Sequence, residues 1–107
     1  DGTCIRDYIH VTDLANAHIK SIEFLTKKNN SFEVNLATGK GYSVKEIVDK
    51  TIELTEKKLN FKFVDRRYGD PAELIASSKN AYQILNWKPQ FSSLDNILLT
   101  MLKTYNV

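Results

Sequence analysis

Three charged side chains have the chemistry of an anion and sugar site: Arg6, Arg67 and Asp70. A guanidinium group is a planar fork of donors that fits phosphate oxygens, and it keeps its charge at working pH. Two such groups on separate loops could clamp one diphosphate from two sides. Asp70 would be repelled by that anion, but its carboxylate only accepts hydrogen bonds and so suits the hydroxyl pair of a ribose. A surface salt-bridge cluster, which is common and weakly stabilising, explains the same residues equally well.

The histidines and the cysteine form no catalytic or metal-binding pattern. His18 falls on the apolar face of a predicted helix, so we interpret it as a core residue, and we interpret His10, which ends a predicted strand, as a structural residue. Two histidines and one cysteine, Cys4, have no metal-ligand spacing, and no nucleophile–base pair stands out. We therefore expect no catalytic residue and no metal here. An unpaired cysteine is typical of a reducing cytoplasm.

The Gly-Lys-Gly stretch at 39–41 has two interpretations. It leads from a predicted strand into a predicted helix, whose N-terminus would favour an anion. The Walker and dinucleotide patterns, however, need more glycines than this stretch contains. The sequence therefore favours a tight turn that feeds a capped helix.

Alternation of apolar and polar residues predicts three strands, at 4–11, 31–36 and 60–65. The segments 37–42 and 66–72 are predicted to be loops.

Helical spacing predicts four helices. The first is capped by Thr12 or Asp13 and ends near Lys28, and the second follows a capping box made by Ser43 and Glu46. The third is short and starts at Ser78, and the fourth follows a second box at 92–95. Trp87, after the third helix, is predicted to pack as an anchor. The apolar face of the first helix is predicted to contain Leu14, Ala17, His18, Ser21, Ile22 and Leu25.

This order of elements predicts an α/β fold, with a small mixed sheet and flanking helices. A length of 107 residues favours one domain and is too short for a complete doubly wound fold. A net charge of +2 is too weak to indicate nucleic-acid binding, and no apolar run approaches the roughly 20 residues that span a bilayer. The opening Asp-Gly-Thr is a turn signal that calls for a preceding strand. We therefore expect the chain to be the C-terminal part of a longer protein.

Three long segments, 1–25, 35–48 and 66–97, together resemble the C-terminal third of the UDP-glucose 4-epimerases, also called UDP-galactose 4-epimerases. These enzymes are Rossmann-type members of the extended short-chain dehydrogenase/reductase family. The stretch RDYIHVTDLANAH alone is shared more loosely with nucleotide-sugar dehydratases and decarboxylases. Its combination with GKGYSVKEI and RRYGDPAELIA is much more specific to the 4-epimerases.

The resemblance implies a role for each residue of the predicted site. Arg6 and Arg67 would contact the UDP diphosphate, Asp70 would bind the uridine ribose hydroxyls, and Tyr8 would line the same pocket. The intact isomerase would interconvert UDP-glucose and UDP-galactose in galactose metabolism, with NAD taking part in hydride transfer at sugar C4. The N-terminal NAD-binding Rossmann domain is not among these residues. Residues 1–107 are thus expected to form a C-terminal UDP-sugar-binding domain that is inactive alone.

Two other functions stay open. The chain could belong to a related NDP-sugar epimerase or dehydratase, or it could be a non-catalytic module that binds nucleotides or RNA through its basic loops. Our expectation is a UDP-sugar partner in the cytoplasm, with no nucleic acid and no membrane. In the family this portion packs on the cofactor domain. Cut free, it would expose an apolar face, so we expect self-association, and a homodimer for the intact enzyme.

Overall fold

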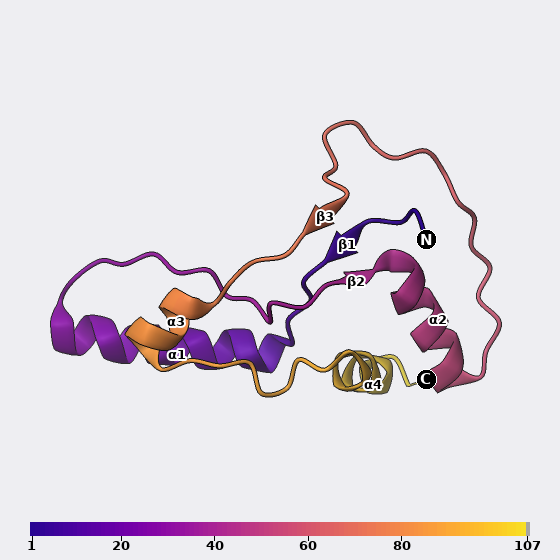
Figure 1. Cartoon of the computed structure of the whole chain (residues 1–107). Helices are drawn as coiled ribbons and strands as arrows, with labels where there is room; N and C mark the ends of the chain where they lie inside the picture. The colour runs from indigo at the N-terminus through magenta and orange to yellow at the C-terminus, as the bar shows by residue number, and fades with distance from the viewer. Residues whose placement is uncertain (107) are drawn as a thin grey trace.

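The structure is a computed structural model that describes residues 1–106. Figure 1 labels its seven elements in chain order: β1 (Ile5–Arg6), α1 (Val11–Lys28), β2 (Tyr42–Ser43), α2 (Val44–Thr55), β3 (Glu73–Leu74), α3 (Lys79–Leu85) and α4 (Leu94–Thr104). The strand order is β2-β1-β3, with β1 antiparallel to β2 and parallel to β3. The expected α/β fold with a small mixed sheet is confirmed.

The molecule is elongated, with the sheet between two helix pairs. α1 packs on α3 at one end, and α2 packs on α4 at the other (Figure 1). The radius of gyration is 16.6 Å, and the principal extents are 50 × 35 × 17 Å. A compact domain of this length has a radius of about 13 Å. The long dimension therefore leaves much of each helix without a covering layer.

The core is centred on Trp87, which is 1% exposed and packs with Ala17, Ala81 and Leu85. The indole Nε1 donates a hydrogen bond to the carbonyl of Asp13 at 2.9 Å, so its polar group is satisfied despite burial. The predicted packing role of Trp87 is confirmed. Half-buried side chains that pack around this cluster are Ile9, Phe24, Phe32, Val34 and Leu36.

Asp13 is a buried carboxylate that fixes the 90–92 segment onto α1. It accepts hydrogen bonds from Gln90 N and Phe91 N, both at 2.9 Å, and from Ser92 Oγ at 2.5 Å. Three donors around one carboxylate compensate for its removal from water. Asp13 was predicted as a possible helix cap. That prediction is wrong, because its carboxylate oxygens accept hydrogen bonds from the 90–92 segment.

The N-cap of α1 is His10. Its Nδ1 accepts from Thr12 N at 3.0 Å, so α1 begins at Val11, earlier than predicted. Its Nε2 lies 2.8 Å from Thr100 Oγ1 on α4, which ties the start of α1 to the last helix. The structural interpretation of His10 is confirmed.

The predicted apolar face of α1 is only partly correct. Ala17 is buried, but His18 is exposed, and so are Ile22 and Leu25, at 66% and 44%. The interpretation of His18 as a core histidine is therefore wrong. The buried face is turned toward Asp13 and Ala17, where α3 and the Trp87 segment pack.

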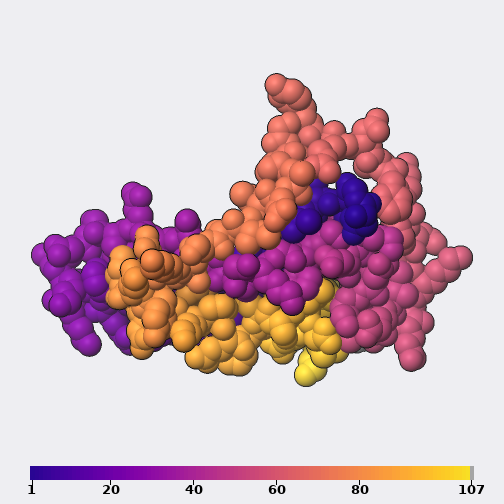
Figure 2. Space-filling model, in the orientation of Figure 1, coloured from indigo at the N-terminus to yellow at the C-terminus, as the bar shows by residue number. Residues whose placement is uncertain are grey.

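Two of the three predicted strands are absent from the ladders of residues 1–106, and the first is reduced to Ile5–Arg6. In 31–36 the alternation does mark burial, because its apolar residues pack on the core without a partner strand. Residues 60–65 are exposed and form an arch that stands away from the body of the molecule (Figure 2). Instead, β2 and β3 form from residues next to or within the predicted loops.

The N-caps of α2, α3 and α4 can be compared with the capping residues predicted from the sequence. Ser43 and Glu46 form the predicted capping box, with both hydrogen bonds present. Ser78 is the N-cap of α3, but its side chain makes no capping hydrogen bond. The cap of α4 is Ser93, and the predicted box at 92–95 is wrong because the Ser92 hydroxyl donates to Asp13.

Candidate functional site

The parallel pairing of β1 with β3 brings Arg6 next to the loop that carries Arg67 and Asp70. Ile5 N donates to the carbonyl of Ala72 at 2.9 Å, so the end of the loop is bound directly to β1. The loop itself turns sharply at Gly69, where φ is +81° and a glycine is favoured. The sheet register therefore determines which side chains meet.

The three predicted charged residues meet at one point. Arg67 Nε lies 2.9 Å from Asp70 Oδ2, and Arg6 Nη2 lies 3.6 Å from Asp70 Oδ1. Arg6 Nη1 also donates to the carbonyls of Ile5 and Pro71, at 2.8 and 3.0 Å. Each carboxylate oxygen thus faces a different guanidinium group, and the cluster has a net charge of +1.

The two arginines differ in how firmly they are held. The Arg6 side chain is 25% exposed and has carbonyl acceptors on two segments, whereas the Arg67 side chain is 86% exposed. An exposed guanidinium with one ion-pair partner can turn to another anion at small cost. Arg6 is consequently the fixed member of the pair and Arg67 the adjustable one.

Arg66 and Tyr8 are not part of this cluster. Arg66 Nη2 donates to the carbonyl of Gly2 at 3.2 Å, so the two adjacent guanidinium groups have different partners. Tyr8 is half-buried, and among residues 1–106 no hydrogen bond joins its side chain to the cluster. The structure brings together three of the four predicted site residues by direct contact.

A hollow of about 450 Å³ lies beside the cluster, under residues 62–67, which form part of the arch and its continuation. In Figure 2 the N-terminal residues lie beneath this arch. The walls are residues 2–4, Val44, residues 62–67 and Asp70. Arg67 and Asp70 thus stand at the edge of a space large enough for part of a small ligand.

Asp7 contributes a contact that sequence reasoning missed. Its carboxylate accepts hydrogen bonds from Thr38 N at 3.0 Å and from Gly39 N at 2.9 Å. The loop amides therefore point at a carboxylate of the same chain, which supports the turn interpretation of 39–41 over a phosphate loop. No local signal links Asp7 to this loop, which is more than thirty residues away in the chain.

No protein-family model matches the chain. UDP-glucose 4-epimerase of Halalkalibacterium halodurans is 49% identical over 98 residues, which cover 92% of this chain and 29% of that protein. The crystal structure of UDP-glucose 4-epimerase from Stenotrophomonas maltophila superposes with a TM-score of 0.89 at 38% identity, over 96% of this chain. By sequence and by fold, this chain belongs to the UDP-glucose 4-epimerase family.

The chain spans about 30% of the length of the family members that it matches. The Stenotrophomonas structure contains NAD and formylated UDP-arabinopyranose. UDP-glucose 4-epimerase from Bifidobacterium longum, in complex with NAD⁺ and UDP, has a TM-score of 0.86 at 34% identity, covering 99% of this chain and 32% of that one. The fold of this segment is therefore the one found in epimerases with bound nucleotide.

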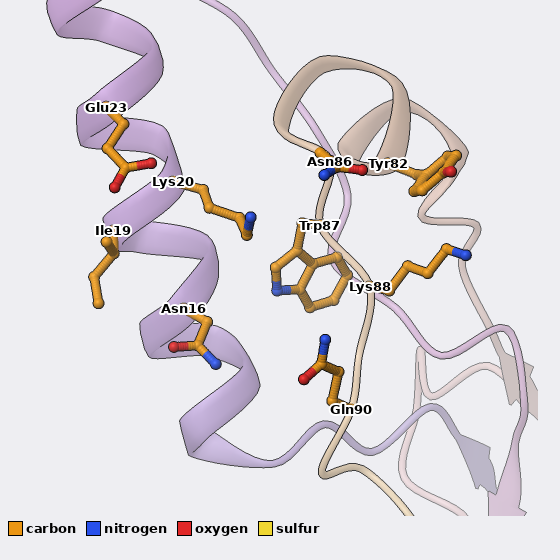
Figure 3. A pocket seen from close by; sticks show the side chains of 9 residues that line it. All are labelled: Asn16, Ile19, Lys20, Glu23, Tyr82, Asn86, Trp87, Lys88 and Gln90. Atoms are coloured by element: carbon orange, nitrogen blue, oxygen red, sulfur yellow. The ribbon is translucent and has the colours of Figure 1, made fainter.

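A second hollow lies between α1 and the end of α3, with a volume of about 440 Å³. Figure 3 shows Lys20 and Glu23 on α1, across from Lys88 and Gln90. The Lys88 ammonium lies 4.7 Å from the ring centroid of Tyr82. None of the predicted site residues lines this hollow, so it is separate from the arginine–aspartate cluster.

Within residues 1–106 no group of three or more His, Cys, Asp or Glu side chains is arranged to hold a metal ion. Cys4 is a free, half-buried thiol. Among the same residues, every helix is too short or too polar to cross a lipid bilayer.

Proposed function

We propose that residues 1–107 are the C-terminal, UDP-sugar-binding part of a UDP-glucose 4-epimerase. The observation that carries the proposal is the meeting of Arg6, Arg67 and Asp70 from segments far apart in the chain. Two guanidinium groups around one carboxylate leave one positive charge without a partner, as a site for an anion requires. Membership of the epimerase family supports uridine diphosphate as that anion.

Each residue has a distinct role in this proposal. Arg6 and Arg67 donate to the oxygens of the diphosphate, and Arg67 turns toward it from its exposed position. Asp70, released from Arg67, accepts hydrogen bonds from the ribose hydroxyls. Tyr8, two residues beyond Arg6, is assigned to the ligand pocket by the resemblance alone, since it is not among the walls of the described hollow.

The intact protein, in our proposal, interconverts UDP-glucose and UDP-galactose with NAD, which takes and returns a hydride at sugar C4. Family structures with bound NAD support this. The glycines of this chain, at positions 2, 39, 41 and 69, do not fit the G-x-G-x-x-G fingerprint. NAD would therefore be held outside residues 1–107, and no catalytic residue is assigned within them.

Isothermal titration of the chain with UDP tests the binding proposal. Because each arginine supplies charge-assisted hydrogen bonds, Arg6→Ala and Arg67→Ala should each weaken UDP binding by roughly tenfold or more. Lys27→Ala is the control for lost charge, since Lys27 is exposed in the last turn of α1 and lines none of the hollow beside the cluster. Equal losses in all three variants would show that only general charge matters.

The same titration with an RNA oligonucleotide decides against the nucleic-acid alternative. We expect UDP to bind and the oligonucleotide to compete poorly. Tight RNA binding with a steep dependence on salt would favour a basic nucleic-acid module instead.

An activity assay tests the assignment of catalysis to the rest of the enzyme. Incubation of the chain with UDP-galactose and NAD should yield no UDP-glucose above a blank. Formation of UDP-glucose by purified chain would contradict the proposal that these residues only bind substrate.

We also propose that the chain self-associates, and that the intact enzyme is a homodimer. An apolar stripe on α1 supports this, because Val11 is 73% and Ile22 66% exposed. On α4, Met101 and Tyr105 are 52% and 71% exposed beside an apolar hollow of about 350 Å³. Exposed apolar patches of this kind are typical of surfaces that bind another protein chain. Sedimentation should show a dimer that Ile22→Glu dissociates, and a monomer at high concentration would contradict it.

We propose the cytoplasm as the compartment, since Cys4 is a free thiol. Cell fractionation with an antibody to the chain should find it with cytoplasmic markers. Recovery with a secreted fraction would contradict this assignment.

A further inference from the structure

The carboxylate of Asp7 holds a loop that lies next to β1. Its Oδ2 accepts a hydrogen bond from Gly39 N at 2.9 Å, and its Oδ1 accepts from Thr38 N at 3.0 Å and Thr38 Oγ1 at 2.6 Å. Asp7 takes part in none of the salt bridges among the described residues. The charge of Asp7 is therefore directed at loop amides and a hydroxyl and not at a cation.

The loop that Asp7 binds is conformationally restricted. Gly39 has φ of +77°, a left-handed backbone that favours glycine. The Thr38 hydroxyl accepts from Lys40 N at 3.1 Å, and Ala37 is 1% exposed. The loop is thus restricted from Ala37 to Lys40, and it gives the Asp7 side chain a rigid support.

This loop continues directly into the strand that pairs with β1. Tyr42 is the ladder partner of Arg6. Gly41 lies so close to β1 that a Cβ atom there would be 2.5 Å from Ile5 Cγ2. The loop, β2 and β1 therefore form one unit, which the Asp7 carboxylate closes.

Arg6 and Asp7 are consecutive residues whose side chains contact different segments. The Arg6 guanidinium reaches Asp70 and the carbonyl of Pro71, while the Asp7 carboxylate reaches the Thr38 loop. Successive side chains at a strand point to opposite faces, so anchoring one fixes the backbone from which the other extends. Asp7 does not touch the proposed ligand site itself.

We propose that Asp7 is a positioning residue that acts on the diphosphate through Arg6. The inference rests on the proposed function, in which Arg6 binds the diphosphate. A binding constellation works only when its groups are held within about 0.5 Å of the productive geometry. Loosening the hold of Asp7 on the loop lets β1 shift and displaces the Arg6 guanidinium from its place beside Asp70.

Two substitutions loosen this hold with little change of shape. Asp7→Asn keeps the size of the side chain, but one oxygen becomes an NH₂ group that cannot accept from a loop amide. Thr38→Val removes only the hydroxyl donor, and Thr38→Ser is its matched control because it keeps that donor. Asp49→Asn is the control for lost charge, since Asp49 lies on α2 and pairs with Lys45.

Titration with UDP and with uridine, which lacks phosphate, separates positioning from general stability. We expect Asp7→Asn to weaken UDP binding roughly tenfold and Thr38→Val roughly threefold, while Thr38→Ser and Asp49→Asn bind as the unsubstituted chain. Uridine should bind all variants equally, because it makes no contact with Arg6. An equal loss of UDP and uridine affinity, or no loss of UDP affinity in Asp7→Asn, would overturn the inference.

A ligand-free measurement keeps this test independent of the proposed function. In proton–nitrogen NMR, Asp7→Asn should shift or broaden the Nε–H signal of Arg6. Faster exchange of the Gly39 amide with an unchanged Arg6 signal would overturn the positioning role. Failure of the unsubstituted chain to bind UDP would instead overturn the proposed function, and the Arg6 signal would still decide this inference.

Discussion

Asp70 places one carboxylate oxygen on each of two arginines: Oδ2 lies 2.9 Å from Arg67 Nε, and Oδ1 lies 3.6 Å from Arg6 Nη2. In the proposed site, the carboxylate occupies the position that an anionic ligand would take. An anion that binds the arginines must compete with Asp70. A ligand that also carries hydroxyl donors compensates the displaced carboxylate, whereas a bare anion leaves it without a partner.

The first prediction concerns this competition. Asp70→Asn removes the competing charge, so inorganic pyrophosphate should bind up to about fivefold more tightly, as expected for an exposed ion pair. The affinity ratio of UDP to pyrophosphate should fall, because the better ribose acceptor is lost. Titration calorimetry with both ligands measures the ratio. A ratio equal to that of the unsubstituted chain would refute the assignment of Asp70 to the ribose.

The second prediction concerns the close approach of Gly41 to β1. A Cβ at this position would lie 2.5 Å from Ile5 Cγ2 and 2.6 Å from Ile75 Cδ1. Gly41→Ala should therefore lower the free energy of unfolding by about 1–3 kcal/mol, the usual cost of overpacking. Urea denaturation gives this value.

Gly2→Ala is a useful comparison for Gly41→Ala. Gly2 has φ of +86° but no atom within 4 Å of an added Cβ, so only backbone strain is introduced. We expect a cost of about 1 kcal/mol there. Similar stability of Gly41→Ala and the unsubstituted chain would show that β1 and β2 separate without cost.

The third prediction concerns the buried carboxylate of Asp13. Asp13→Asn leaves one of its three donors facing an NH₂ group, so the free energy of unfolding should fall by about 2–3 kcal/mol. The indole fluorescence of Trp87 reports the transition, because Trp87 donates to the Asp13 carbonyl. The exposed Asp49→Asn should change stability by less than about 0.5 kcal/mol. Equal effects of the two substitutions would contradict the role of Asp13.

The fourth prediction concerns pH and Lys50, which pairs with Glu53 on its own helix and links α2 to α4 through Asp95. The hydrogen bond to Glu53 raises the pKa of Lys50, burial opposes this, and the charge of Asp95 adds to it. A raised pKa in the folded state gives stability that is complete below the unfolded pKa of about 10.4 and is lost as pH rises through the folded value.

Thermal melts across this window test the sign of the effect. The difference in Tm between the unsubstituted chain and Lys50→Gln should be largest near neutral pH and shrink above about pH 10.4. A difference that grows with pH would mean that Lys50 does not gain from its acidic partners.

Local signals in the sequence predicted local structure well. The hydrogen bonds of Ser43 and Glu46 involve residues three apart, so the capping box could be predicted from spacing alone. The positions of the helices follow from periodicity for the same reason. The packing of Trp87 was also predictable, because a large apolar ring next to a helix end is expected to be buried.

What the sequence could not predict depends on contacts between distant residues. Burial of Asp13 depends on the 90–92 segment, and the role of Asp7 depends on the Thr38 loop. The alternation in 60–65 predicted a strand, but a strand needs a partner, and these residues have none in the ladders of residues 1–106. The face of α1 that is covered depends on where α3 packs, so the burial of His18 was predicted wrongly.

The site residues, like the fold, could be predicted only in part from the sequence. Residue chemistry indicated Arg6, Arg67 and Asp70, but equally a surface cluster, and the family resemblance favoured the ligand site. Only the pairing of β1 with β3 shows that these three residues meet. Tyr8 rests on the resemblance alone.

The most direct test of the account is a proton–nitrogen NMR titration of the chain with UDP. The Nε–H signals of Arg6 and Arg67 and the amide of Asp70 should shift together and saturate with one UDP per chain. Saturating UDP with no change at these three residues, or with changes confined to the hollow around Lys20 and Lys88, would contradict it.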